Sequence, residues 1–349
     1  MQTSKKIDLD DASGFISFPA IRGVQASREF YTAMVPFKQI PRIFVFNEYE
    51  VPPNLRAQRN LNVARVPSIA KYVINNKNDY VFSALTASID GKMDFLPIEK
   101  KSPIGEIKIS MNATLIINDG QHRRAAIEKV LEERPDLAYE SIPVVFFVDL
   151  GLARSQQIFA DLNKNAVRPS RSLSILYNIR DNSSREVLDI IQKVELFKGK
   201  IELEKTSISK RSTKLFTLSS LYSACSITLE DDLEKKELKR RKALLIEYFN
   251  ILTNIISPWK EVLDGRLTPA EFRMEYVCSH GILLESLGYL ATYVLENYPN
   301  NWKEKIQSLS KIDWLRSDEW EGVALNRGRM SRTQANLEQT IKYLKNQIE

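Results

Sequence analysis

The stretch from residue 113 to residue 124 is Ala113-Thr114-Leu115-Ile116-Ile117-Asn118-Asp119-Gly120-Gln121-His122-Arg123-Arg124. Its first five residues have the composition of a buried strand, Gly120 predicts a tight turn, and a helical pattern follows to about Glu133. Pro135 ends this helix, because a proline cannot donate a backbone hydrogen bond and restricts the residue before it. The apolar run Pro143–Val148 predicts another strand, so the order strand, turn, helix, strand predicts a βαβ-type crossover.

Similar elements precede this unit. The segments Phe15–Pro19, Arg42–Phe46 and Tyr80–Ile89 are rich in β-branched and aromatic residues and predict strands. Between the last two, Asn62–Asn75 places apolar residues at helical spacing.

The pattern changes after Arg168-Pro169, where strand-like runs nearly vanish. Long amphipathic stripes over Lys239–Ile256, Phe272–Leu295 and Arg332–Ile348 predict helices. We therefore predict an α+β protein, with an N-terminal α/β domain over residues 1–175 and a mainly α-helical domain over residues 176–349.

Composition narrows the class of protein. The 349 residues are 43% hydrophobic and 27% charged, which is typical of a globular chain. The only cysteines, Cys225 and Cys278, are far apart and have no partners at metal-ligand spacing, so neither a disulfide framework nor a metal site is indicated. Acidic residues follow Met1-Gln2-Thr3-Ser4-Lys5-Lys6 in place of an apolar leader, and no stretch approaches membrane-spanning length. We expect a cytoplasmic protein with no membrane partner, and the net charge of +6 favours a polyanionic partner.

The turn at residues 119–124 is the strongest candidate site. A glycine between a strand and a helix lets the backbone approach a ligand, and the free N–H groups of the helix start favour an anion. Asp119 suits the N-cap, while Arg123 and Arg124 place positive charge where the helix dipole disfavours it unless an anion is bound. In the alternative interpretation Asp119 only caps the helix, His122 contacts a backbone carbonyl and one arginine lies in solvent.

The segment Asp119-Gly120-Gln121-His122-Arg123-Arg124-Ala125-Ala126-Ile127 resembles the signature of the DGQHR-domain family, and the surrounding sequence resembles its DndB branch of DNA sulfur modification (phosphorothioation) proteins. Further matching segments are Phe18–Gln25, Leu55–Asn62, Ser83–Gly91, Gln157–Pro169 and, more thinly, Leu325–Arg332. The resemblance implies a ParB/sulfiredoxin-like fold, in which the corresponding turn binds nucleotide phosphates. That role maps onto Gly120, Gln121, His122 and Arg123. It also implies a regulator that binds the promoter DNA of the phosphorothioation genes.

A second basic strip follows a short predicted helix. Asn163, Lys164 and Arg168 lie in a segment that offers amides and positive charge to phosphate oxygens, and it could face the turn at Asp119. The alternative is an ordinary helix end, capped by Asn163 and broken by Arg168-Pro169.

Candidate DNA contacts lie in the C-terminal half. They are Lys239, Arg240 and Arg241 in a Lys-rich helical segment, and Arg327, Arg329 and Arg332 before the last helix. Ser331 is a candidate cap of the last helix. In the alternative interpretation the first group is a solvated helix face and the second an ordinary arginine-rich loop. Trp302, Trp314 and Trp320 favour core positions over base stacking.

Three functions are consistent with these features. The first is a DNA-binding transcriptional regulator of a DNA phosphorothioate modification gene cluster, with double-stranded promoter DNA of its own operon as partner. The second is a nucleoside triphosphatase or DNA-nicking enzyme, with Asp119 and His122 as catalytic residues and ATP with Mg²⁺ as candidate cofactor. The absence of a Walker-type loop argues only against a P-loop version of this enzyme. The third is an adaptor that recruits other phosphorothioation proteins through the helical half.

Overall fold

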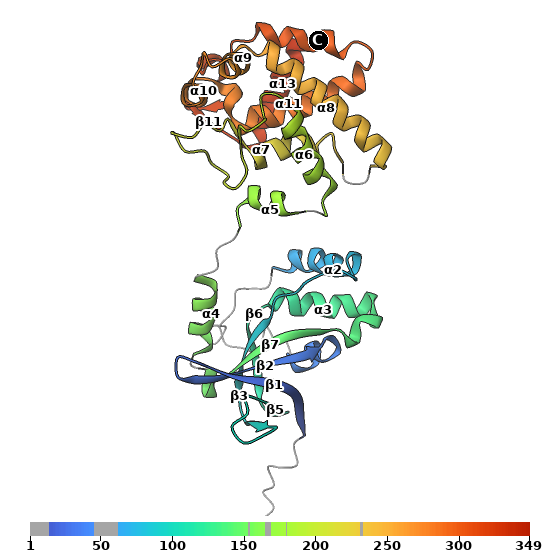
Figure 1. Ribbon diagram of the computed structural model, residues 1–349, viewed down its shortest axis with the longest axis vertical. Coiled ribbons are helices and arrows are strands. Elements are labelled where there is room, and N and C mark those ends of the chain that lie inside the picture. The colour runs from blue at the N-terminus through green and yellow to red at the C-terminus, as the bar shows by residue number, and fades with distance from the viewer. Residues whose placement is uncertain (1–13, 45–61, 153, 165–168, 179, 231–232) are drawn as a thin grey trace, which may run out of the picture. The chain divides into compact units, whose positions relative to one another are not determined.

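The computed structural model describes residues 14–44, 62–152, 154–164, 169–178, 180–230 and 233–349. The chain forms two compact units, Met1–Val167 and Arg168–Glu349 (Figure 1). Helix α5 (Arg171–Tyr177) packs against α6 (Asn182–Lys193) and α7 (Leu218–Ser226) of the second unit. The predicted boundary after residue 175 therefore falls inside a helix, whereas the two units divide between residues 167 and 168.

The first unit is built on a seven-stranded sheet with the order β4-β5-β1-β2-β7-β3-β6. The strands are β1 (Phe15–Gln25), β2 (Arg28–Pro36), β3 (Leu85–Asp90), β4 (Met93–Pro97), β5 (Ile104–Ser110), β6 (Thr114–Asp119) and β7 (Ser141–Val148). Neighbouring strands are antiparallel except β3 and β7, which are parallel. Together with the helices of the second unit, this sheet confirms the predicted α+β class.

Two helices, α2 (Val66–Asn75) and α3 (Gln121–Glu133), pack against each other in this unit, with α3 drawn nearer the strands (Figure 1). Helix α2 presents Ala70 and Val73 to Ala126 and Val130 of α3, and all four side chains are buried. The predicted helices over 62–75 and up to residue 133 are thus confirmed, and α3 ends immediately before Arg134-Pro135 as expected.

The predicted βαβ crossover is wrong in one respect. The order β6, α3, β7 is present, but β6 and β7 are not parallel, because β3 lies between them and pairs antiparallel with β6 and parallel with β7. The predicted strand over Tyr80–Ile89 contains most of β3, but the sequence gave no indication that this strand lies between β6 and β7.

The predicted strand over Arg42–Phe46 is also wrong for residues 42–44, which are the part of this range that the structure describes. Residues Ile40–Ile43 form the short helix α1, with Pro41 in its first turn, where the fixed φ of proline suits a helix. Val45 and Phe46 lie outside the described residues.

The second unit is helical. Besides α5, α6 and α7 it contains α8 (Lys235–Ile255), α9 (Ser257–Leu263), α10 (Pro269–Glu275), α11 (Gly281–Asn297), α12 (Trp302–Ile306) and α13 (Gln334–Ile348). Two small sheets pair β8 (Ile201–Glu202) with β9 (Phe216–Thr217) and β10 (Leu325–Asn326) with β11 (Arg329–Met330). Helix α11 contacts α7 and α13, and Trp302, Trp314 and Trp320 are buried in this core, as predicted.

The predicted helix over Phe272–Leu295 is interrupted between α10 and α11. Tyr276 forms an isolated β-bridge with Leu315, and the Val277 N–H donates to the Trp314 carbonyl at 2.9 Å. The backbone is therefore used for a tertiary contact there and leaves the helix. In the described part of the chain, no helix has both the length and the apolar content needed to cross a membrane.

Candidate functional site

The turn at Asp119-Gly120 is shaped by its glycine. Gly120 has φ of +104°, and a Cβ there would lie 2.3 Å from Leu85 Cδ2 and 3.1 Å from an Arg123 guanidinium nitrogen. Any side chain would therefore be strained and would clash. The expectation that Asp119 is the N-cap is wrong, since Gly120 holds that position and α3 begins without a side-chain cap. The first N–H groups of α3 thus have no side-chain acceptor from the cap residue.

Arg123 lies across this turn. One guanidinium nitrogen donates to Asp119 Oδ2 at 2.6 Å, and the other donates to the Ser83 carbonyl at 2.9 Å and to the Ser83 hydroxyl. The Arg123 side chain is 16% exposed and that of Asp119 is 48% exposed. An incoming phosphate could reach this pair, but it would have to compete with Asp119 for the guanidinium.

Arg124 points away from the turn. Its Nε donates to the Phe44 carbonyl at 3.0 Å, a terminal nitrogen donates to Glu128 at 2.7 Å, and its side chain is only 9% exposed. Gln121 is buried as well. The contacts of Arg124 and the burial of Gln121 give these residues a structural role, and the geometry leaves Asp119, Gly120, His122 and Arg123 as the accessible part of the motif.

The surroundings of His122 favour its neutral imidazole form. Burial, followed by the positive charge of Arg65, lowers its pKa, and Asp119 opposes them only in part. Its Nε2 accepts a hydrogen bond from the Asn62 N–H at 3.2 Å, so the ring proton resides on Nδ1. His122 therefore supplies no fixed positive charge to an anion.

Sequence reasoning missed Arg65. It is exposed and close enough to His122 to affect its pKa, although 57 residues separate them. The sequence feature that could have pointed to Arg65 is its position three residues after Leu55–Asn62, a segment that resembles the DGQHR-domain family. Most of that segment lies outside the described residues. Arg65 adds a second cation beside the turn.

The second basic strip begins inside a helix. Asn163 and Lys164 form the last turn of α4 (Ser155–Lys164), and Arg168 lies outside the described residues. At the start of the same helix, the Ser155 hydroxyl contacts Asn118 of β6 at 3.4 Å. Lys164 is about 13 Å further along the helix at 1.5 Å per residue. A shared site with the turn therefore stays a prediction.

The cluster on α8 is partly neutralised. Lys239 and Arg240 are exposed, while Arg241 is half-buried and donates to the Thr228 carbonyl at 3.1 Å. Arg240 and Arg241 share the carboxylate of Glu237, and their hydrogen bonds lower the pKa of Glu237 to about 2. Arg241 also lies 3.7 Å from the Glu230 carboxylate, so the two guanidinium groups face two carboxylates, and the net positive charge of the cluster comes from exposed lysines such as Lys239.

The cluster before the last helix belongs to a hairpin. Arg327 and Gly328 form the two-residue loop between β10 and β11, both with left-handed φ, and both loop N–H groups donate to the Glu321 carboxylate. Arg329 is exposed, whereas Arg332 donates to Glu285.

The last helix has a different cap from the expected one. The expectation that Ser331 caps it is wrong, since Thr333 accepts from the Asn336 N–H. The Ser331 hydroxyl instead donates to the Asn336 side chain at 2.7 Å.

Within the described ranges, no three His, Cys, Asp or Glu side chains gather as a metal site.

The fold and this turn define a two-unit α+β protein in which a strand, a glycine bend and a helix carry the sequence DGQHR. The chain belongs to the DndB family, described as DNA-sulfur modification-associated, whose model matches residues 18–349. The match covers both units. No curated protein and no solved structure matches the chain. Family membership associates the protein with DNA sulfur modification.

Proposed function

We propose that this protein is a DNA-binding transcriptional regulator of a DNA phosphorothioate modification gene cluster and that it binds double-stranded promoter DNA of its own operon. Family membership supports the biological setting. The observation that carries DNA binding is a basic stripe on α8, formed by Lys235, Lys236, Lys239 and Arg240. The hairpin residues Arg327, Arg329 and Arg332 are proposed as further contacts.

The spacing of the basic stripe places its four side chains on one face of the helix. Lys235 and Lys239 are four residues apart, as are Lys236 and Arg240, and all four are exposed. Leu238 and Leu245 anchor the opposite face in the core. A fixed row of cations of this kind suits the phosphates of a nucleic-acid backbone, which set affinity and register and carry no sequence information.

The turn at Gly120 is proposed as a phosphate or nucleotide site of the same regulator. Arg123, Arg65 and the uncapped start of α3 supply the attraction, and Asp119 is the competitor that a phosphate displaces from Arg123. The proposal extends to Asn163, Lys164 and Arg168 only if the end of α4 reaches the turn.

The enzyme alternative uses the same turn, with Asp119 and His122 as catalysts. Both groups are already engaged, Asp119 by Arg123 and His122 Nε2 by the Asn62 N–H, so the geometry favours binding over catalysis. Phosphate release from ATP with Mg²⁺ that Asp119→Ala abolishes would reverse this preference.

Gel-shift titration with the upstream DNA of the operon at several salt concentrations tests the proposal. The double variant Lys236→Gln/Lys239→Gln should bind more weakly, and the slope of log affinity against log salt should fall by about two, since about one counterion is released per phosphate contact. The variant Lys198→Gln/Lys260→Gln makes the same charge change at exposed lysines of the same unit and should keep the original slope. If the two variants bind equally, the basic stripe does not contact DNA. If the unmodified chain shows no promoter binding at any salt concentration, the adaptor function is favoured.

A further inference from the structure

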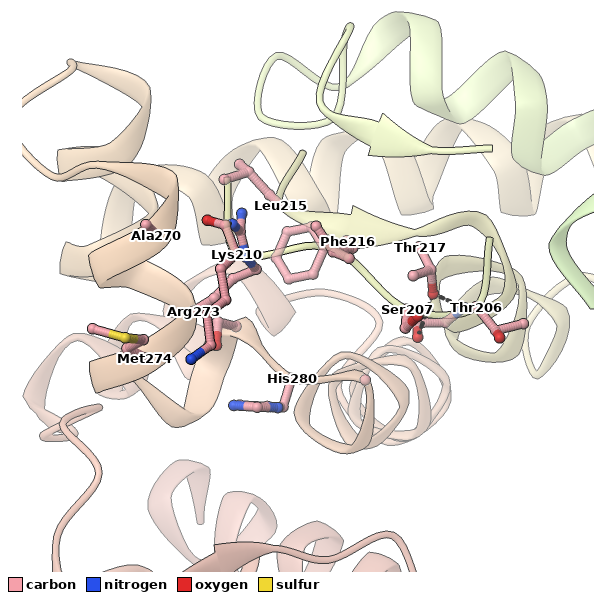
Figure 2. A pocket seen from close by; sticks show the side chains of 14 residues that line it. Thr206, Ser207, Lys210, Leu215, Phe216, Thr217, Ala270, Arg273, Met274 and His280 are labelled. Carbon is pink, nitrogen blue, oxygen red and sulfur yellow. Dashed lines mark hydrogen bonds between the residues drawn. The ribbon is translucent and has the colours of Figure 1, made fainter. Parts of the chain in front are cut away.

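A pocket of about 330 Å³ lies in the helical unit, and none of its lining residues is assigned above (Figure 2). Arg332 lies beside its wall, since a Cβ at Gly281 would be 3.8 Å from an Arg332 guanidinium nitrogen. Its wall is formed by the loop over residues 206–210, by β9, by α10 and by the segment that leads into α11. Its volume is at the lower end of the range typical of small-molecule sites, which is about 300–1,000 Å³. It therefore fits a small ligand rather than a peptide.

The pocket carries positive charge. Lys210 and Arg273 line it, and among the described residues of its wall none is Asp or Glu. The Arg273 guanidinium donates to backbone carbonyls of the loop, those of Ser209, Lys210, Ser212 and Lys214. Carbonyl oxygens satisfy the N–H groups without cancelling the charge. Because charges in salt solution are screened over about 10 Å, both cations raise the potential across the whole pocket.

Hydrogen-bond donors suited to an oxyanion lie in the same wall. Five lining residues bear hydroxyl groups, namely Thr206, Ser207, Thr217, Ser220 and Ser279. The Ser279 hydroxyl already donates to the Tyr276 carbonyl, and the Thr217 and Ser220 hydroxyls are hydrogen-bonded to each other at 2.9 Å, so the donors for a ligand are Thr206, Ser207 and one member of the Thr217–Ser220 pair. Figure 2 shows Thr206, Ser207 and Thr217 toward one end of the pocket and Lys210 and Arg273 toward the other. Helix α11 begins here at Gly281 without a side-chain cap, so its first N–H groups add donors. A Cβ at Gly281 would lie 2.6 Å from the Ser220 hydroxyl, so only glycine keeps the helix start this close to that group.

The remaining wall is apolar. Leu215, Phe216 and Met274 line it, and Phe216 is held by edge-to-face contacts with Trp259 and Phe272. His280 adds no charge, because burial and then Arg316 lower its pKa to about 4. A ligand with one anionic group and one flat apolar part would match the combination of polar and apolar surfaces.

We propose that this pocket binds a small organic phosphate of about mononucleotide size, with the phosphate on the hydroxyl groups and the start of α11 and the apolar part against Phe216 and Met274. The number of donors favours the three terminal oxygens of a phosphate over the two oxygens of a carboxylate. This site is separate from the turn at Gly120 and from the basic stripe, and it does not depend on the proposed DNA binding.

Isothermal titration calorimetry on the full chain tests the site with three probes: adenosine monophosphate, inorganic phosphate and adenosine. Adenosine monophosphate should bind with one site per chain, inorganic phosphate more weakly, and adenosine not measurably. Ser220→Ala should weaken the binding of adenosine monophosphate about tenfold, as expected when a hydrogen bond to a charged group is lost. Lys210→Gln should weaken it as well, because it removes one of the two cations that raise the potential across the pocket. Lys198→Gln removes an exposed lysine outside the pocket and should bind like the unmodified chain.

Three outcomes would overturn the assignment. The first is the absence of binding by adenosine monophosphate and phosphate at millimolar concentration. The second is unchanged affinity in both pocket variants, with their folding verified by circular dichroism. The third is a loss of affinity in Arg123→Gln with Lys210→Gln unaffected, which would place the probe at the turn instead.

Discussion

Arg123 and Arg124 are adjacent in sequence, yet their guanidinium groups serve different parts of the molecule. Arg124 donates to the Phe44 carbonyl and to Glu128 from a nearly buried position, so Arg124→Ala should leave a buried carbonyl without its donor. We expect a loss of about 2 kcal/mol in the free energy of unfolding of the first unit. Urea titration followed by far-ultraviolet circular dichroism measures it. Lys129→Ala on the same helix is the control, and an equal effect in both variants would contradict the structural role.

His280 makes the second unit sensitive to acid. Its pKa is about 4 when folded, against an ordinary value of 6.5, because of burial and of Arg316. Between these values the unfolded chain binds a proton that the folded chain does not, so stability falls as the pH drops from about 6.5 to about 4. The total loss is roughly 3 kcal/mol. Tryptophan fluorescence during urea unfolding at pH 7 and pH 4.5 measures it. In His280→Gln the difference should shrink, and an unchanged difference would assign it to other groups.

The local conformation around a residue could be predicted better than the groups that the residue contacts. The sequence indicated that Gly120 is a bend and that the arginines after it are unusual at a helix start. It could not show that Asp119 pairs with Arg123 and does not cap α3, or that Arg124 reaches Phe44, 80 residues away. Arg65 was missed for the same reason, because its proximity to His122 arises only from tertiary packing.

Helices and strands could be predicted where the periodicity of their own residues determines them. The pairing of strands within the sheet could not be predicted in this way. The helices α2, α3, α8 and α13 follow apolar spacing in the sequence. The antiparallel relation of β6 and β7 depends on β3, whose insertion is a contact between distant segments. The break before α11 likewise reflects a bridge from Tyr276 to Leu315, which no local pattern encodes.

The β10–β11 hairpin depends on a carboxylate outside it. Glu321 accepts from both N–H groups of the loop at Arg327 and Gly328, and the φ of Arg327 is +52°. Glu321→Ala should therefore lower the free energy of unfolding of the second unit by about 1 kcal/mol. Tryptophan fluorescence during urea unfolding measures the change, with the neighbouring Glu319→Ala as control. A loss of the same size in the control would show that general charge, and not the loop contact, is responsible.

The two units have separate hydrophobic cores, so we expect them to unfold separately. The residues of one core lie between Phe18 and Phe146, and those of the other between Ile175 and Ile348. All four tryptophans, Trp259, Trp302, Trp314 and Trp320, lie in the second unit, so their fluorescence reports on that unit, whereas circular dichroism reports on both.

Single core substitutions in the full chain test this independence. Val144→Ala and Leu287→Ala each remove a fully buried side chain, one from each unit, and large-to-small changes of this kind cost about 1–5 kcal/mol. Val144→Ala should shift a circular dichroism transition and leave the fluorescence transition in place, while Leu287→Ala should shift the fluorescence transition. If Val144→Ala moves the fluorescence midpoint by the same amount, the chain unfolds as one cooperative body. In that case, the proposed DNA binding at α8 and the proposed phosphate binding at Gly120 would be coupled through stability, and the effect of a variant in either unit would have to be corrected for unfolding of the other.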